Sequence, residues 1–366
     1  MKGTAFKRIC LFFCFCLLSV SSLATSASAQ GEPEALLSEL REILPPSLRT
    51  ENTEQLLSRV GVRGIFEEIL AALSGEGGAF ASFLLLCLGS AVLIAAAHAV
   101  ADGSAASLLE GLAAAMMGIV IFEPLGACAE ATVRQLNESA AFFGAASPIM
   151  HGITLAAGGV QSAAAATMGA QITLYVIELF FCRLVVPVAS VLMALGLIST
   201  LGEEGAALSS LSGSIRRIFL WMLGLGTTLL SAALSLQTIL SAGADSAAMR
   251  TAKYTATGLL PLVGGAVSAS LSTLATGLSF VKTTAGVSVV AALLLLTVPM
   301  LIRLLLYRLC LDISSGFSEF LGIRGAARMF SAFKSGMDAL IAVFALCSVL
   351  FLLQSVLFLY AGVAIL

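Results

Sequence analysis

Several ionisable residues lie inside long apolar runs of this chain, where low-dielectric surroundings make a charge costly. Glu178 and Arg183 interrupt the apolar run 172–198, and Lys282 follows a segment of small residues. Charges at such places are typical of polar paths, proton relays or ion pairs. Five residues of α-helix turn through about 140°, which predicts that Glu178 and Arg183 are poor partners for each other.

Glu178 and Lys282 each allow two interpretations. Glu178 either faces an internal polar site or reaches the membrane surface from a helix end. Lys282 is either part of a polar path or, as we favour, an anchor at the membrane interface. Arg303 and Arg308 lie in another apolar run and are expected to extend toward the cytoplasm.

The two histidines and the other reactive side chains do not indicate catalysis. His98 and Asp102 form an i,i+4 pair at the end of an apolar segment, which favours an interfacial cap over a proton relay. His151 stands alone and does not suggest a metal ligand. The sequence has no nucleophile elbow, no Walker A motif and no CxxC pair after residue 29. We therefore expect no enzymatic activity, cofactor or metal.

Two segments rich in glycine, alanine and serine, 148–166 and 260–277, have few large side chains. In the second segment, small residues recur at intervals of four and share a helix face. Such faces favour close helix packing, and a lining for a polar path is the alternative. The candidate residues for a translocation path or for packing are Pro148, Gly152, Glu178, Pro261, Gly264, Gly265, Ser268, Ser272 and Lys282.

Residues 148–242 and 261–362 share landmarks at a nearly constant offset, which predicts an internal repeat. Pro148 and Pro261 are 113 residues apart, and each has a glycine four residues later. Arg217 and Arg328 are 111 residues apart. Repeated halves with glycine- or proline-interrupted segments are typical of membrane transport folds.

Composition places the chain in a membrane. Hydrophobic residues make up 59% and charged residues 11%, with a mean hydropathy of +1.03. A soluble domain cannot bury so much apolar surface, so membrane lipid is an expected partner. The formal net charge of −2 and the lack of a long basic run argue against nucleic-acid binding.

The N-terminal third divides into three predicted parts. Residues 1–29 have a basic start, a short apolar core and an Ala-Ser-Ala cleavage site, as in a secretory signal peptide. An uncleaved first helix is the alternative. Residues 30–79 predict extracytoplasmic amphipathic helices that end in a flexible, glycine-rich junction at 74–78. Residues 80–128 predict a hairpin of two spans.

Basic residues predict the orientation. Arg216 and Arg217 precede one span, and residues 303–334 contain a second basic cluster. With both clusters cytoplasmic, the two copies run parallel and both termini lie outside. The segments 148–166 and 260–277 are then expected to be re-entrant hairpins beside six spans, although 167–200 suits either one span or two. The predicted fold is an all-α, polytopic membrane helix bundle with two parallel internal repeats and short N-terminal helices.

Three short motifs identify a family resemblance. The tripeptide Ala252-Lys253-Tyr254, the run Leu260-Pro261-Leu262-Val263-Gly264-Gly265-Ala266-Val267-Ser268 and the later Val281-Lys282 resemble the stage III sporulation protein AE family of endospore-forming bacteria. The signal sequence, the EILPP helix and the later spans are similar as well, so the likeness covers nearly the whole chain.

The resemblance implies a function but carries over no catalytic residues. It implies a multi-pass protein of the mother-cell membrane around the forespore, working with the ring and channel proteins of the same operon. Such a subunit would belong to a sporulation channel or secretion complex and would pass small molecules. Two alternatives are a self-sufficient secondary transporter, which the repeats also suit, and a membrane scaffold that recruits the ring proteins.

Overall fold

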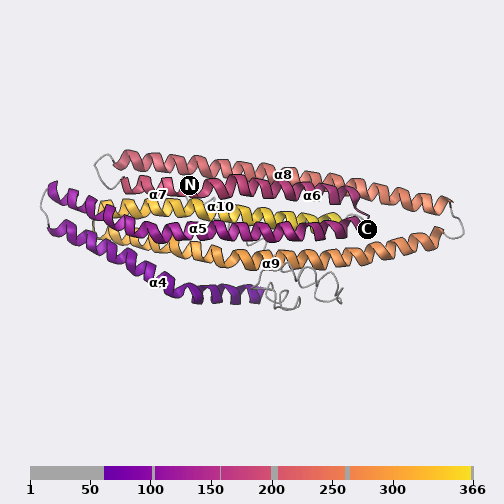
Figure 1. Cartoon of the computed structure of the whole chain (residues 1–366), viewed down its shortest axis with the longest axis horizontal. Helices are drawn as coiled ribbons and strands as arrows, with labels where there is room; N and C mark the ends of the chain where they lie inside the picture. The colour runs from indigo at the N-terminus through magenta and orange to yellow at the C-terminus, as the bar shows by residue number, and fades with distance from the viewer. Residues whose placement is uncertain (1–61, 101–103, 157, 199–204, 260–263, 364–366) are drawn as a thin grey trace.

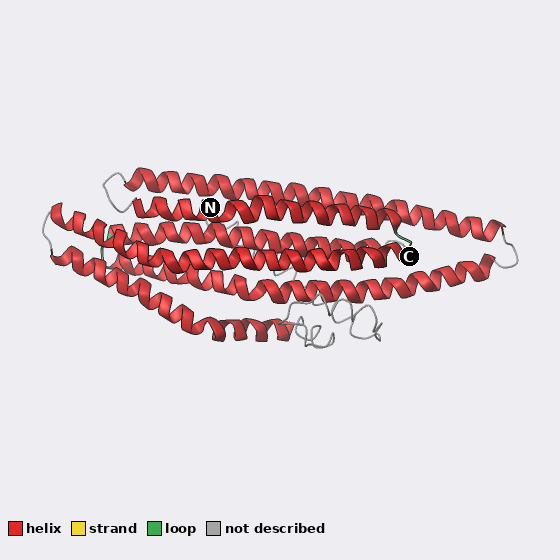
Figure 2. Cartoon of the chain, viewed as in Figure 1, coloured by secondary structure: helices red, strands yellow, loops and turns green. Residues whose placement is uncertain are grey.

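The computed structural model describes residues 62–100, 104–156, 158–198, 205–259 and 264–363. All regular structure in these ranges is helical, which confirms the predicted all-α class (Figure 2). The predicted signal peptide and most of the N-terminal amphipathic region lie outside the described residues. The elements are α4 Val62–Val100, α5 Ser104–Ala156, α6 Val160–Val176, the π-helix η1 Ile177–Cys182, α7 Arg183–Ile198, α8 Gly205–Leu259, α9 Gly264–Phe320 and α10 Arg324–Val363.

The helices lie side by side in one elongated, up-and-down bundle (Figure 1). α6, η1 and α7 follow one another without a loop, so residues 160–198 form a single rod. Among the described residues, six rods are long and apolar enough to cross a membrane. α4, α7 and α9 end, and α5, α8 and α10 begin, at one end of the bundle (Figure 1). The basic clusters assigned to the cytoplasm are on helices that meet at this end.

The last two helices form the centre of the bundle. α10 packs against α5, α6, α7, α8 and α9, and its phenylalanines at 330, 333, 344 and 351 are fully buried. In the most apolar part of each helix, 67% of α10 is buried but only 17% of α8. The two predicted copies therefore occupy different places, with the second at the core and the first at the periphery.

The segments expected to be re-entrant are parts of long helices instead. α5 continues through Pro148 to Ala156, and α6 begins at Val160 after a turn with Gly158 at φ +88°. α9 is helical from Gly264 onward without a break. The first segment thus joins two spans and the second opens one, so this pair does not share a conformation. The repeat itself stays a prediction.

Helix continuity also corrects the expectation for residues 74–78. Despite its three glycines, this stretch is part of α4, and the predicted flexible junction is absent. The expected spans at 80–100 and 109–128 lie inside α4 and α5. α5 then runs on through the polar stretch 129–141. Packing along a long neighbouring helix can outweigh the modest helix-breaking tendency of a few glycines.

Candidate functional site

A polar seam surrounds the beginning of α6. Its first donor–acceptor pairs come from Asp245 of α8, whose Oδ1 accepts the backbone N–H of Gln161 at 2.9 Å and whose Oδ2 accepts that of Ser162 at 2.7 Å. Asp245 is only 4% exposed. The residue before α6, Gly159, has no side chain to cap the helix. A carboxylate from another helix therefore satisfies the free N–H groups and faces the positive end of the helix dipole.

Two amide side chains meet the next turn of α6 from different helices. Gln237 of α8 donates from Nε2 to the carbonyl of Ala165 at 3.2 Å. Gln354 of α10 donates from Nε2 to the carbonyl of Ala166 at 3.5 Å. A Cβ at Gly169 would lie 2.9 Å from Nε2 of Gln354, so the glycine permits this close approach. The seam thus joins α6 to α8 and α10 by polar contacts.

Two buried polar atoms of the seam have unused hydrogen-bonding capacity. Within the described residues, the Oγ of Ser162 and the Oε1 of Gln354 have no hydrogen-bond partner. An unpaired polar group at membrane depth is costly. Buried groups of this kind commonly bind an ordered water or another polar guest. The seam therefore keeps one hydroxyl and one amide oxygen with unused hydrogen-bonding capacity.

His151 adds α5 to the seam. Its Nδ1 lies 3.2 Å from Oγ of Ser147 and 3.1 Å from Oγ1 of Thr167. Thr167 already donates its hydroxyl proton to the carbonyl of Ala163 at 2.8 Å. The hydroxyl oxygen is then left to accept, which favours a proton on Nδ1 of His151. The histidine that stands alone in the sequence is part of a polar network in the folded chain.

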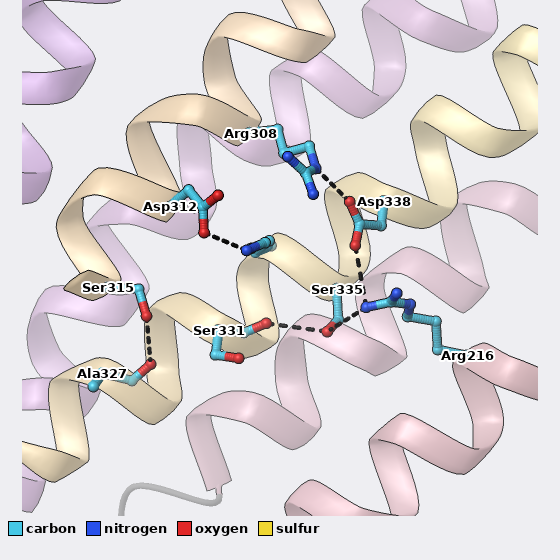
Figure 3. Close-up of polar contacts among 9 residues, drawn as sticks. Arg216, Arg308, Asp312, Ser315, Ala327, Ser331, Ser335 and Asp338 are labelled. Atoms are coloured by element: carbon cyan, nitrogen blue, oxygen red, sulfur yellow. Dashed lines mark hydrogen bonds and ion pairs between the residues drawn. The ribbon is translucent and has the colours of Figure 1, made fainter. Parts of the chain in front are cut away.

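A second polar cluster, shown in Figure 3, links three helices nearer the end with the α9–α10 connection. Asp338 of α10 accepts from Nε of Arg308 at 2.6 Å and pairs with Nη1 of Arg216 at 3.1 Å. Lys334 pairs with Asp312 in the same cluster. Arg303 and Arg308 were both expected to extend toward the cytoplasm. Instead, each pairs with a carboxylate of a neighbouring helix, Arg308 with Asp338 and Arg303 with Glu76 of α4 at 3.3 Å.

His98 contacts a carboxylate of the next helix. Asp102 lies outside the described residues, and His98 Nδ1 is 3.0 Å from Oε2 of Glu110. The other oxygen of Glu110 accepts the backbone N–H of Gly325 at 2.7 Å. Glu110 therefore caps the first turn of α10 while it joins α4 and α5. The predicted pair with Asp102 itself stays a prediction.

The Glu178–Arg183 pair corrects the geometric expectation. Oε1 of Glu178 lies 3.6 Å from Nη2 of Arg183, and both side chains are 69% exposed. Residues 177–182 form a π-helix, in which hydrogen bonds join residues five apart. The wider turn brings positions 178 and 183 to one side, whereas the prediction assumed α-helical geometry. Glu178 also lies on the surface of the chain rather than at an internal site.

The remaining predicted residues are not brought together into one site by the described part of the chain. Pro148 lies within α5, and Gly152 is exposed with open space beside it, so Gly152 is not a member of the seam. Pro261 lies outside the described residues. The other five are in the first half of α9, where the side-chain surroundings are not described: Gly264, Gly265, Ser268, Ser272 and Lys282. The sequence-based set thus missed Asp245, Gln237 and Gln354, although an amide within an apolar run is a detectable signal.

A cavity of about 240 Å³ lies between α6, α8 and α10. It has mostly apolar walls, so its chemistry suits a hydrocarbon chain better than a polar solute. No group of three or more His, Cys, Asp or Glu side chains suited to a metal ion occurs in the described ranges. The cavity is lined by Val176, Met222, Leu223, Gly226, Thr227, Leu230 and Leu350.

Comparison with known proteins identifies one family. The family described as Stage III sporulation protein AE matches residues 46–362, which include every helix from α4 to α9 and nearly all of α10. No curated protein and no solved structure matches the chain.

Proposed function

The chain belongs to the stage III sporulation protein AE family, and from this premise we propose that it is an integral membrane subunit of a sporulation channel or secretion complex. The complex would link the mother cell to the forespore and pass small molecules. The subunit would reside in the mother-cell membrane around the forespore. Its partners would be the ring and channel proteins of the same operon.

The observation that supports a role in passage is the polar seam at α6. Buried hydrogen-bonding groups inside a membrane bundle are costly and usually functional. Here Asp245, Gln237 and Gln354 converge on one helix from α8 and α10. Ser162 and Gln354 each keep one buried atom without a partner in the described chain. These atoms supply an acceptor and a hydroxyl where a small polar solute or a chain of waters would pass.

The substitution Gln354→Leu tests this role because it keeps the volume and removes the amide. The matched control is Ser348→Ala on the same helix, since Ser348 is buried and bonds only within α10 to the carbonyl of Phe344. Each variant would replace the native copy in the spore-forming host. We expect Gln354→Leu to lower heat-resistant spores at least about tenfold, as lost polar contacts at membrane pathways are poorly tolerated. The control should sporulate normally.

Complex assembly decides between passage and scaffolding in the same strains. We expect the Gln354→Leu protein to reach normal levels and to co-purify with the operon's other proteins. Spore loss that is accompanied by loss of co-purification would favour the scaffold. Normal sporulation of the Gln354→Leu strain would contradict a role of the polar seam in passage.

Reconstitution separates the proposed subunit from a self-sufficient transporter. The purified full chain would be placed in liposomes loaded with a mixture of small polar metabolites. Retention of the contents agrees with a subunit that needs its partners. Unaided and solute-specific release would instead support the transporter.

A further inference from the structure

An ion pair lies uncovered at the middle of the rod formed by α6, η1 and α7. This rod spans Val160–Ile198, and Glu178 is its nineteenth residue of 39. Glu178 and Arg183 are its only charged residues. Both side chains are largely exposed, so no other part of the described chain shields them.

The rod is too long for a bilayer to cover its whole surface. At 1.5 Å per residue it is about 58 Å long, whereas the hydrocarbon core is about 30 Å thick. Large apolar side chains are exposed along its full length, from Val160 to Ile198. They include Met168, Ile172, Tyr175, Leu179, Leu184 and Val191.

Every placement of the bilayer along this rod leaves an unfavourable surface. If the bilayer is centred on the rod, the Glu178–Arg183 pair faces hydrocarbon, which is costly for ionised groups. If the bilayer covers only the half before Glu178, then Leu184, Val191 and Ile198 face water. If the bilayer covers only the half after Glu178, then Val160 and Met168 face water. In each case an extended apolar or charged patch needs protein to cover it.

We propose that a second copy of this chain covers the α6–η1–α7 face, with a two-fold axis along the membrane normal. The face has one acid and one base, so it is electrically neutral and complementary to itself. Within one copy the charged ends of Glu178 and Arg183 already meet at 3.6 Å and therefore at one depth. A two-fold axis beside them faces each charge with the opposite charge of the second copy.

The four charges form a closed cluster at the centre of the interface, and the apolar side chains on either side pack around it. Such an arrangement shields the ions from lipid and buries the part of the rod that extends beyond the bilayer. The π-helix matters here because it places both members of the pair on the same side of the rod. The interface is independent of what the complex transports.

Charge reversal in two differently tagged full-length copies tests the proposal. Wild-type copies should co-purify from native membranes in nanodiscs. Two copies of Glu178→Arg, or two of Arg183→Glu, should co-purify at least about tenfold less, because like charges then face each other across the interface. One Glu178→Arg copy with one Arg183→Glu copy should restore recovery, since the reversed charges complement each other between chains.

The double variant Glu178→Arg with Arg183→Glu in one chain controls for folding and should self-associate as wild type does. Failure of the mixed single variants to recover, while the double variant recovers, would overturn the proposal, because the pair would then act only within one chain. Unchanged self-association of either single variant would overturn it as well.

Photo-crosslinking identifies what touches the face. Benzoylphenylalanine would replace Tyr175 on α6, which is 64% exposed, and Leu85 on α4, which is 71% exposed. α4 packs on α5 and α9, and Figure 1 shows it at the edge of the bundle away from α6, α7 and α8. We expect a product of twice the chain mass from position 175 and none from position 85. A product with a different protein, or no product at 175, would overturn the second copy as the occupant.

Discussion

Asp338 shows how one side chain can hold three helices together. This residue of α10 forms ion pairs with two arginines, Arg308 of α9 and Arg216 of α8. Arg216 also donates to Oγ of Ser335 at 3.4 Å. The carboxylate is only 16% exposed, so water screens these pairs weakly. Its removal leaves two partly buried arginines without their common partner.

We expect Asp338→Asn to lower the free energy of unfolding by about 2 kcal/mol, because the two partly buried arginines lose the carboxylate that they share. Thermal unfolding of the purified chain in nanodiscs measures the effect. The control is Asp312→Asn, which breaks the more exposed pair with Lys334 in the same cluster. Its loss should stay below about 1 kcal/mol. Equal losses for the two variants would contradict a central role for Asp338.

At the scale of elements, the turn between α5 and α6 depends on two glycines and on a cap from elsewhere. Gly158 has φ +88°, a conformation that side chains with a Cβ adopt at a cost. The N–H of Gly158 bonds to the carbonyl of Leu155 at 2.9 Å, and that of Gly159 to the carbonyl of Thr154 at 3.0 Å. These bonds close the end of α5, and the carboxylate of Asp245 on α8 caps the start of α6.

Gly158→Ala should destabilise the chain by about 1–2 kcal/mol, because the left-handed conformation is strained for alanine. The control is Gly152→Ala in the last turns of α5, where no atom lies within 4 Å of the added Cβ. It should be neutral or stabilising by up to about 1 kcal/mol, since alanine is the better helix former. Melting temperatures in the same nanodiscs compare the two. A turn that tolerates alanine at 158 would refute the importance of the positive φ.

At the scale of the whole molecule, the bundle has its basic clusters near one end. Arg324 is at the start of α10, and Arg216 and Arg217 are on α8, which begins at the same end. The positive-inside rule predicts that this end lies in the cytoplasm. The α5–α6 turn and the C-terminal end of α8 point the other way (Figure 1). The helices alternate in direction, so testing two positions orients the whole bundle.

Cysteine accessibility in intact cells checks this orientation. Ala248→Cys on α8 and Leu321→Cys at the α9–α10 turn are both at exposed positions. We expect a membrane-impermeant maleimide to label position 248 from outside and position 321 only after permeabilisation. The unsubstituted chain is the control, because four of its cysteines, Cys87, Cys128, Cys310 and Cys347, are buried. The opposite labelling pattern would invert the predicted topology.

The sequence alone was enough to predict that the chain lies in a membrane, that its fold is all-α, and which family it belongs to. Long apolar runs with few charges predict membrane helices, since hydropathy and helix propensity are properties of neighbouring residues. The same local signals predicted spans at 80–100 and 109–128, which lie inside α4 and α5. Short motifs around Pro261 were enough to indicate the family that matches residues 46–362.

Only the tertiary structure decided which polar groups meet. Asp245 caps a helix 83 residues away, and Arg216 reaches Asp338 across the bundle, and no local pattern encodes such distances. Glu178 and Arg183 are close in sequence, yet their pairing depended on a π-helix that the α-helical period does not predict. Helix continuity through residues 74–78 likewise follows from packing along α9. Local sequence sets what each segment prefers, and contacts between distant segments select among those preferences.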